Sequence, residues 1–171
     1  DMYQLMFCQL SDGSFDIDEI KKLSIYRFSK YSNEVQNFIL NKFNETINSK
    51  DLFNKNFTKE EILKLLVLVL NLKETIVRLI DNFDFADYIP KIVIYLEDEN
   101  IISEAMQFLL GYFHTIGIDI IIFNPSGLFN INNVIKDTII NNFRLDVMKY
   151  DSKYKDLMSL KQSVFSKFLR K

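Results

Sequence analysis

The spacing of apolar residues predicts that the first half of the chain is helical. Apolar positions recur in three stretches at the spacing of one face of an α-helix. These stretches span about residues 17–29, 33–47 and 58–82. Asp16 and Asn33 are the predicted caps of the first two helices. Thr58 and Glu61 form the clearest start, because each side chain can bond the other residue's backbone N–H. Residues 62–70 are apolar on nearly every side, so we expect them to be buried against several elements.

In the second half of the chain the pattern changes to continuous apolar runs. Two such runs, at residues 92–96 and 118–123, are rich in β-branched residues, which is typical of strands in a parallel sheet buried on both faces. Between them, residues 104–116 have a helical pattern, with Ser103 as the expected N-cap and Gly117 as the expected left-handed C-cap. We therefore predict a strand–helix–strand unit with two parallel strands.

The pattern after this unit predicts a short helix, a third strand and a closing amphipathic helix. They are expected at about residues 131–139, 143–148 and 152–171, respectively. The predicted fold class is α/β, with a helical N-terminal half packed on a small parallel, Rossmann-like sheet of about three strands. The expected regions, forming one compact unit, are a helical region at 1–88, an α/β core at 89–150 and a C-terminal helix at 151–171. A sheet of three strands has two edges that must be covered to prevent pairing with other chains. The first residue is also not Met, so we expect the chain to be a piece of a larger protein.

Composition and charge argue against several classes of protein. The 171 residues carry a net charge of −2, whereas nucleic-acid binding needs a concentration of Lys and Arg. The longest apolar run, residues 65–70, is far shorter than the roughly 18 to 20 residues of a membrane span. Cys8 is the only cysteine, so no internal disulfide can form and we expect a reducing, cytoplasmic location. A single His and a single Cys also argue against a zinc site.

Polar residues follow both strands of the predicted unit. Glu97 and Asp98 come after the first strand, and Asn124, Ser126 and Gly127 come after the second. In open parallel α/β sheets, ligands bind outside the carboxyl ends of the strands, and neighbouring strands lie about 5 Å apart. The two carboxylates are suited to Mg²⁺, which takes oxygen ligands. The Asn-Pro-Ser-Gly loop can offer N–H groups and a hydroxyl to a phosphate at the start of the following helix.

Each of these features also has an ordinary structural interpretation. Carboxylates in front of a helix are favoured by its dipole, and Asn-Pro-Ser-Gly is common turn chemistry. The glycine-rich dinucleotide and P-loop patterns are absent, which weakens those nucleotide-binding interpretations. Arg144 lies on the predicted third strand, where it either pairs with Asp146 or binds an anion, and we favour the pairing. His114 lies near the end of a predicted helix, where the dipole favours a cation.

One extended segment carries a family resemblance. It is IPKIVIYLEDENIISEAMQFLLGYFHTIGIDIIIFNPSG, continued by NINNVI and FRLDVMKY. This segment resembles the C-terminal region of the bacterial YceG-like proteins that occur with tellurite-resistance and general stress genes. The resemblance implies a larger parent protein, described as a component of a biosynthetic module. It implies no catalytic residues for the present chain.

Two functional hypotheses follow. The first is a Rossmann-like module that binds a phosphorylated metabolite or nucleotide with Mg²⁺, using the residues at the strand ends together with Arg144. The alternative is a non-catalytic scaffold or interaction domain, which docks onto the remainder of a parent protein or onto other stress-response proteins. The second hypothesis predicts a contiguous exposed apolar patch or an open strand edge in the structure.

Overall fold

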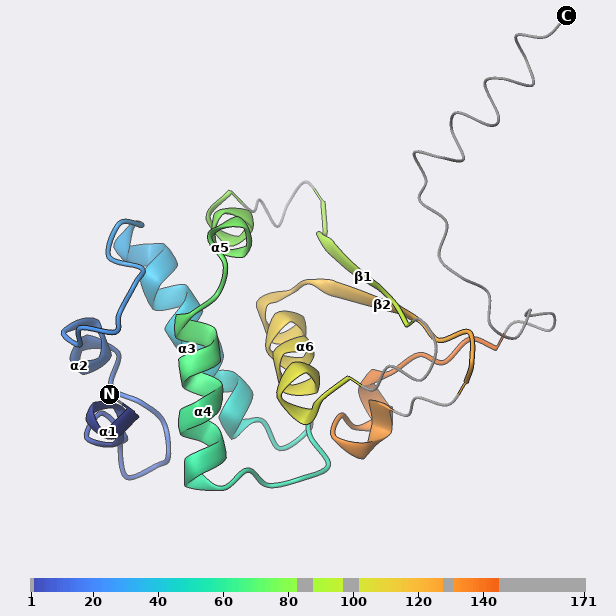
Figure 1. The fold of residues 1–171 in the computed structure, drawn as a ribbon, viewed down its shortest axis with the longest axis horizontal. Coiled ribbons are helices and arrows are strands. Elements are labelled where there is room, and N and C mark those ends of the chain that lie inside the picture. The colour runs from blue at the N-terminus through green and yellow to red at the C-terminus, as the bar shows by residue number, and fades with distance from the viewer. Residues whose placement is uncertain (1, 83–87, 97–101, 128–130, 145–171) are drawn as a thin grey trace, which may run out of the picture.

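The computed structural model describes residues 2–82, 88–96, 102–127 and 131–144 (Figure 1). Within these residues, six α-helices and two short 3₁₀ turns accompany a two-stranded sheet. The elements are α1 (Met2–Met6), α2 (Ile17–Lys21), α3 (Asn33–Asn48), α4 (Lys59–Leu70), α5 (Glu74–Asp81), β1 (Lys91–Tyr95), α6 (Glu104–Ile116), β2 (Asp119–Phe123), η1 (Ile131–Asn133) and η2 (Asp137–Ile139). The α/β class is therefore confirmed.

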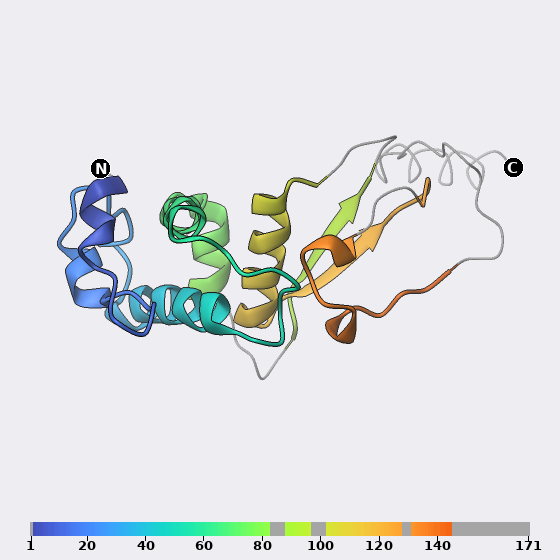
Figure 2. The same cartoon turned by 90° about the horizontal axis from the view of Figure 1, so that it is seen from below.

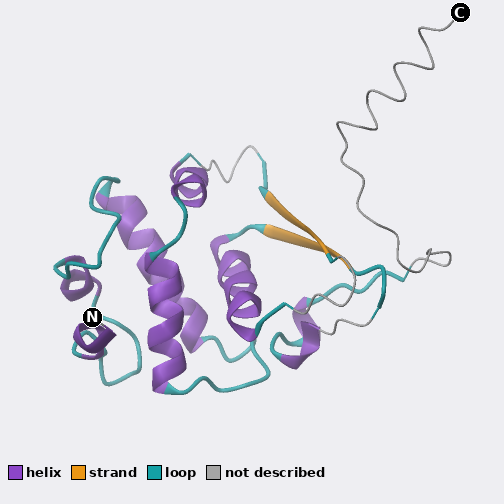
Figure 3. Ribbon diagram, viewed as in Figure 1, coloured by secondary structure: helices purple, strands orange, loops and turns teal. Residues whose placement is uncertain are grey.

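The elements form successive layers. In Figure 2, α1 and α2 lie at one end of the molecule, α3 to α5 follow, and α6 lies between these helices and the strands. The strands are parallel and in register, with Lys91 opposite Asp119 and Tyr95 opposite Phe123. Figure 3 shows the two strands at the side of α6 that faces away from α1. The predicted strand–helix–strand unit is therefore confirmed, and α6 joins it to the helical half.

The capping residues explain where several helices begin and end. Asp16 caps α2, and Thr58 and Glu61 form the reciprocal capping box that the sequence predicts for α4. Ser103 caps α6, and Gly117 ends it with a left-handed φ of 102°. Local chemistry at these positions is strong enough to fix the helix ends.

Three helix predictions need correction. The cap of α3 is Ser32, whose hydroxyl accepts the N–H of Val35, rather than Asn33. The first predicted helix ends at Lys21 and does not continue to residue 29. The long helix predicted at 58–82 is two helices, because the side chain of Asn71 donates to the carbonyl of Val67 at 2.7 Å and closes α4. Such a side-chain bond competes with continuation of the helix.

The helix predicted at 131–139 is also wrong, since η1 and η2 replace it. This segment pairs with a distant part of the chain: Phe53 and Ile135 form an antiparallel bridge. The N–H of Asn54 donates to the carbonyl of Val134 at 2.8 Å, and that of Lys136 donates to the carbonyl of Leu52 at 3.0 Å. These strand-like bonds hold the backbone in a conformation that a continuous helix does not allow.

The third strand is not confirmed. Phe143 and Arg144 belong to no strand, and the rest of the predicted strand lies outside the described residues. The closing helix predicted at 152–171 lies outside them as well. The sheet of the described chain therefore has two strands rather than three. None of the described helices combines the length and the apolar character that crossing a membrane requires.

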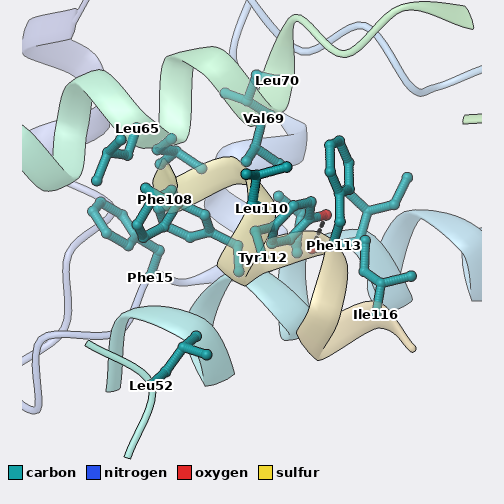
Figure 4. Close-up of a cluster of buried hydrophobic side chains, with 14 of the residues drawn as sticks. Phe15, Leu52, Leu65, Val69, Leu70, Phe108, Leu110, Tyr112, Phe113 and Ile116 are labelled. Carbon is teal, nitrogen blue, oxygen red and sulfur yellow. Dashed lines mark hydrogen bonds between the residues drawn. The ribbon is translucent and has the colours of Figure 1, made fainter. Parts of the chain in front are cut away.

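Helix α6 is the centre of the core. Phe108 and Tyr112 are fully buried on it, among side chains of α3, α4 and the segment around Leu52 (Figure 4). The hydroxyl of Tyr112 donates to the carbonyl of Ile39 at 3.1 Å. Because α6 contacts helices on one side and β2 on another, it fixes the sheet relative to the helical half.

Candidate functional site

The parallel register brings the ends of the two strands to one edge of the sheet. The ladder continues past β1, where the N–H of Leu96 donates to the carbonyl of Phe123 at 2.9 Å. The chain leaving Leu96 and the turn at 124–127 therefore start side by side. Glu97 and Asp98, which come next, lie outside the described residues. The shared edge that the sequence predicts for the two loops is present at their starting points, while the carboxylate site stays a prediction.

The turn after β2 is held by its own hydrogen bonds. The N–H of Gly127 donates to the backbone carbonyl of Asn124 at 3.2 Å and to its side-chain Oδ1 at 3.1 Å. The hydroxyl of Ser126 also donates to Oδ1 of Asn124, at 3.3 Å. Gly127 has a φ of 68°, and a Cβ built on it would meet no atom of the described residues within 4 Å. The turn is thus preformed, and no described residue crowds the Cα of Gly127.

The structure changes the expected role of the following helix. A three-residue 3₁₀ turn, η1, is the next described element after Gly127, so no helix dipole of useful length follows the turn. The described helix that starts at this edge is α6, because a helix connecting parallel strands runs antiparallel to them. Its first-turn carboxylate, Glu104, already pairs with Lys55, whose Nζ lies 2.7 Å from Glu104 and 2.9 Å from Glu61.

Sequence reasoning missed both Lys55 and its bridging role. The two carboxylates raise the pKa of Lys55, through hydrogen bonds from its ammonium group to Glu104 and Glu61. Lys55 therefore stays charged and joins the starts of α4 and α6. No local signal predicts this contact, because Lys55 and Glu104 are 49 residues apart.

Gln107 is the second residue that the sequence analysis missed. Its side chain is 4% exposed, and its Nε2 donates to the carbonyl of Ile102 at 2.9 Å. Its Oε1 is buried and has no hydrogen-bond partner among the described residues. A buried acceptor without a donor is unfavourable by about 1–3 kcal/mol, which makes it a candidate acceptor for a bound molecule. Gln107 follows the N-terminal turn of α6, so it lies towards the edge where the strands end.

The remaining candidate residues do not join this group. Arg144 is exposed, and its expected partner Asp146 lies outside the described residues. His114 is exposed in the last turn of α6, the position where the dipole favours a cation. Cys8 is buried, and burial is the main cause that raises the pKa of its thiol, so it packs as a small apolar side chain. Across the described ranges, no three His, Cys, Asp or Glu side chains gather to hold a metal ion.

Comparisons with known proteins agree with the resemblance. The uncharacterised protein YceG of Bacillus subtilis (strain 168) is 26% identical over 159 residues, which cover 90% of this chain and 30% of that protein. The chain thus spans about 30% of the length of the curated relative that it matches. No solved structure matches it. The sequence profile of the YceG domain matches residues 1–158, so the chain belongs to the YceG domain family.

Proposed function

We propose that the edge formed by the ends of β1 and β2 binds a phosphorylated metabolite or nucleotide, within a longer protein of the YceG family. The observation that carries the proposal is the parallel register of the strands, because of which the loops after β1 and β2 begin side by side. In open α/β sheets of this kind, the edge beyond the carboxyl ends of the strands is where ligands bind.

The described residues offer complementary groups for such a ligand. Because no described residue crowds Gly127, a phosphate can approach the backbone closely there. The hydroxyl of Ser126 can turn from Asn124 to a phosphate oxygen, because a hydroxyl hydrogen rotates freely. The buried Oε1 of Gln107 is an acceptor, which suits a hydroxyl of a sugar rather than a phosphate. A sugar phosphate or a nucleotide carries both kinds of group.

In this proposal the carboxylates of Glu97 and Asp98 would hold Mg²⁺ together with a phosphate of the ligand. Mg²⁺ usually keeps several waters and takes one or two carboxylates together with phosphate oxygens. The ion would neutralise charge between the carboxylates and the phosphate, and the chain's own groups would orient the ligand.

The proposal is tested by thermal unfolding with a panel of nucleotides and sugar phosphates, each with and without Mg²⁺. A ligand at about 100 times its Kd stabilises a protein by about 2.7 kcal/mol. For a chain of this size that corresponds to a rise in Tm of about 5–11 °C. We expect such a rise for at least one phosphorylated compound with Mg²⁺. No rise with any member of the panel would refute the proposal.

Variants then locate the site. Ser126→Ala and Glu97→Gln are expected to reduce the rise at a fixed ligand concentration. The matched control is Ser14→Ala, because the Ser14 hydroxyl donates to Oδ1 of Asp12 at 2.6 Å in another turn that has a glycine with positive φ. Gln107→Met should also reduce the rise. An equal effect of Ser14→Ala would assign the loss to turn stability rather than to binding.

The cellular setting is a further part of the proposal and comes from the family resemblance. We place the parent protein in a cytoplasmic stress response that includes tellurite resistance. Deletion of the parent gene in its host is then expected to increase sensitivity to tellurite. Restoring the wild-type gene should rescue growth, whereas the Ser126→Ala gene should rescue it less well than the Ser14→Ala gene. Unchanged tellurite sensitivity after deletion would contradict this setting.

A further inference from the structure

Among the described residues, one face of the sheet is covered by other elements and the other face is not. Alternate residues of both strands are partly buried against the core on the side of α6: Ile92, Ile94, Ile120 and Ile122. The residues between them point to the opposite face. Val93, Ile121 and Phe123 are exposed there and Tyr95, beside Phe123, is partly buried; we call these four residues the open face. Val93 is 61% exposed, Ile121 39% and Phe123 49%, so apolar groups dominate a surface in contact with water.

This open face is unusual for parallel strands. Parallel sheets are normally covered on both faces, because each crossover places a helix on one side. The open-face residues are paired across the strands, Val93 with Ile121 and Tyr95 with Phe123, and so form one continuous apolar strip. The ion pair of Lys91 and Asp119, at 3.2 Å, marks one end of the strip. Such a strip normally packs against another element.

We propose that the chain's own residues 152–171 cover the open face as an amphipathic helix and complete a helix–sheet–helix arrangement. Apolar residues in this segment recur at helical spacing along one side. They are Tyr154, Leu157, Met158, Val164, Phe165 and Phe168. A helix of this length spans about 30 Å, whereas a strand of five residues spans about 16 Å, so one helix is long enough to cross both strands.

The position of the chain favours the open face over other apolar surfaces. After η2 the described chain runs along the side of the molecule where the strands lie, in both Figure 1 and Figure 2. The link from residue 144 to residue 152 reaches at most about 28 Å, which is longer than the strands of about 16 Å. Another exposed apolar group is on and just after α1, where Tyr3 and Phe7 are 78% and 84% exposed, and α1 lies at the opposite end in Figure 2.

Charge also favours an occupant from within the chain. Residues 152–171 contain six basic side chains and one acidic side chain, whereas residues 1–151 contain 15 basic and 22 acidic ones. A basic segment is attracted to an acidic body, and the short link keeps its effective concentration high. A second copy of the chain or another protein has no such tether, so intramolecular docking is favoured.

Cross-linking between introduced cysteines tests the contact directly. Ile121→Cys is combined with Val164→Cys or with Leu157→Cys, and a short bis-maleimide reagent is added. Native Cys8 is buried, so it stays out of the reaction. We expect an intramolecular cross-link in a monomer for at least one pair. The matched control, Tyr3→Cys with Val164→Cys, should give none. Cross-linked dimers, or equal yields from the control, would overturn the proposal.

Hydrogen exchange provides a second readout that does not depend on cysteine geometry. In the wild-type chain the amides of 152–171 should be protected. Ile121→Lys should speed their exchange by about tenfold or more, because a charge on the open face opposes docking. Tyr3→Lys should leave it unchanged, and α4 should stay protected in both variants as evidence of an intact core. Exchange in 152–171 that is fast in the wild type, or insensitive to Ile121→Lys, would refute docking.

Discussion

Gly111→Ala is expected to destabilise the protein, although alanine favours a helix more than glycine does. Gly111 lies in the middle of α6 and faces the segment before α4. A Cβ at this position would lie 2.8 Å from Cζ and 2.9 Å from Cε1 of Phe53, and 3.3 Å from Cδ2 of Leu52. The first two distances are shorter than carbon atoms tolerate, so the ring of Phe53 or the helix has to move.

The surroundings of Phe53 decide the magnitude. Its ring is stacked on Phe108 with centroids 5.3 Å apart, it meets Phe57 edge-on at 5.1 Å, and the residue is only 7% exposed. The ring therefore has little room to swing away. Overpacking of this kind costs about 1–3 kcal/mol, while the change from Gly to Ala in a helix contributes about 0.8–1.0 kcal/mol in the other direction. We expect a net loss of up to about 2 kcal/mol in the free energy of unfolding.

The assay is equilibrium unfolding in urea together with thermal unfolding. The expected loss lowers Tm by up to about 8 °C for a chain of this size. Phe53→Leu removes the ring that the new methyl group meets. In that background Gly111→Ala should be neutral or stabilising, with a coupling of at least about 1 kcal/mol between the two sites. A higher stability of Gly111→Ala in the wild-type background would refute the reasoning, because helix propensity alone would then dominate.

Three further predictions concern hydrogen bonds and pH. Asn44→Ala should lower the free energy of unfolding by about 2–4 kcal/mol in urea, because the Asn44 side chain bonds both the N–H and the carbonyl of buried Phe15, each at 2.9 Å. The pKa of Glu61 is lowered from 4.5 to about 2, mainly by the hydrogen bond from the Thr58 N–H and further by those from Lys55 and the Thr58 hydroxyl. Its contribution to stability should therefore be complete above pH 4.5 and lost as the pH falls to about 2, and Glu61→Gln should remove this loss in acid unfolding curves. Burial raises the pKa of Tyr26 from 10.0 to about 12, so stability should fall as the pH rises between these values, and less steeply in Tyr26→Phe.

Sequence patterns predict the parts of this fold that local chemistry determines. Ser103 and Gly117 bound α6 at the predicted residues, because a cap bonds within its own turn. Asn71 is a position where the apolar pattern and the structure differ. The apolar pattern continues beyond it to Ile80, yet its side chain closes α4 by bonding back to Val67. Helical spacing therefore shows that residues are helical, but it does not show that they belong to one helix.

Contacts between distant segments account for the other differences. Ile135 belongs to a segment with a helical pattern, yet it pairs with Phe53, which is far away in the sequence. At the candidate site, the common edge of the two loops follows from parallel topology and was predicted. The bond of Lys55 to Glu104 and the burial of the Gln107 oxygen depend on how α6 packs, so no local pattern predicts them.

Helix α6 connects these observations. It is buried against α3 and α4 through Phe108 and Tyr112, and it packs against β2 on another side. Any change that displaces α6 relative to the helical half therefore also displaces the strand ends that form the proposed binding edge. Gly111→Ala makes this testable: after its smaller stability is taken into account, the ligand-induced rise in Tm should also decrease. Asn44→Ala removes hydrogen bonds between α3 and Phe15 and leaves the packing of α6 on Phe53 in place, so its ligand-induced rise should decrease less. This difference would show that the close packing of α6 on Phe53 positions the edge as well as stabilising the fold.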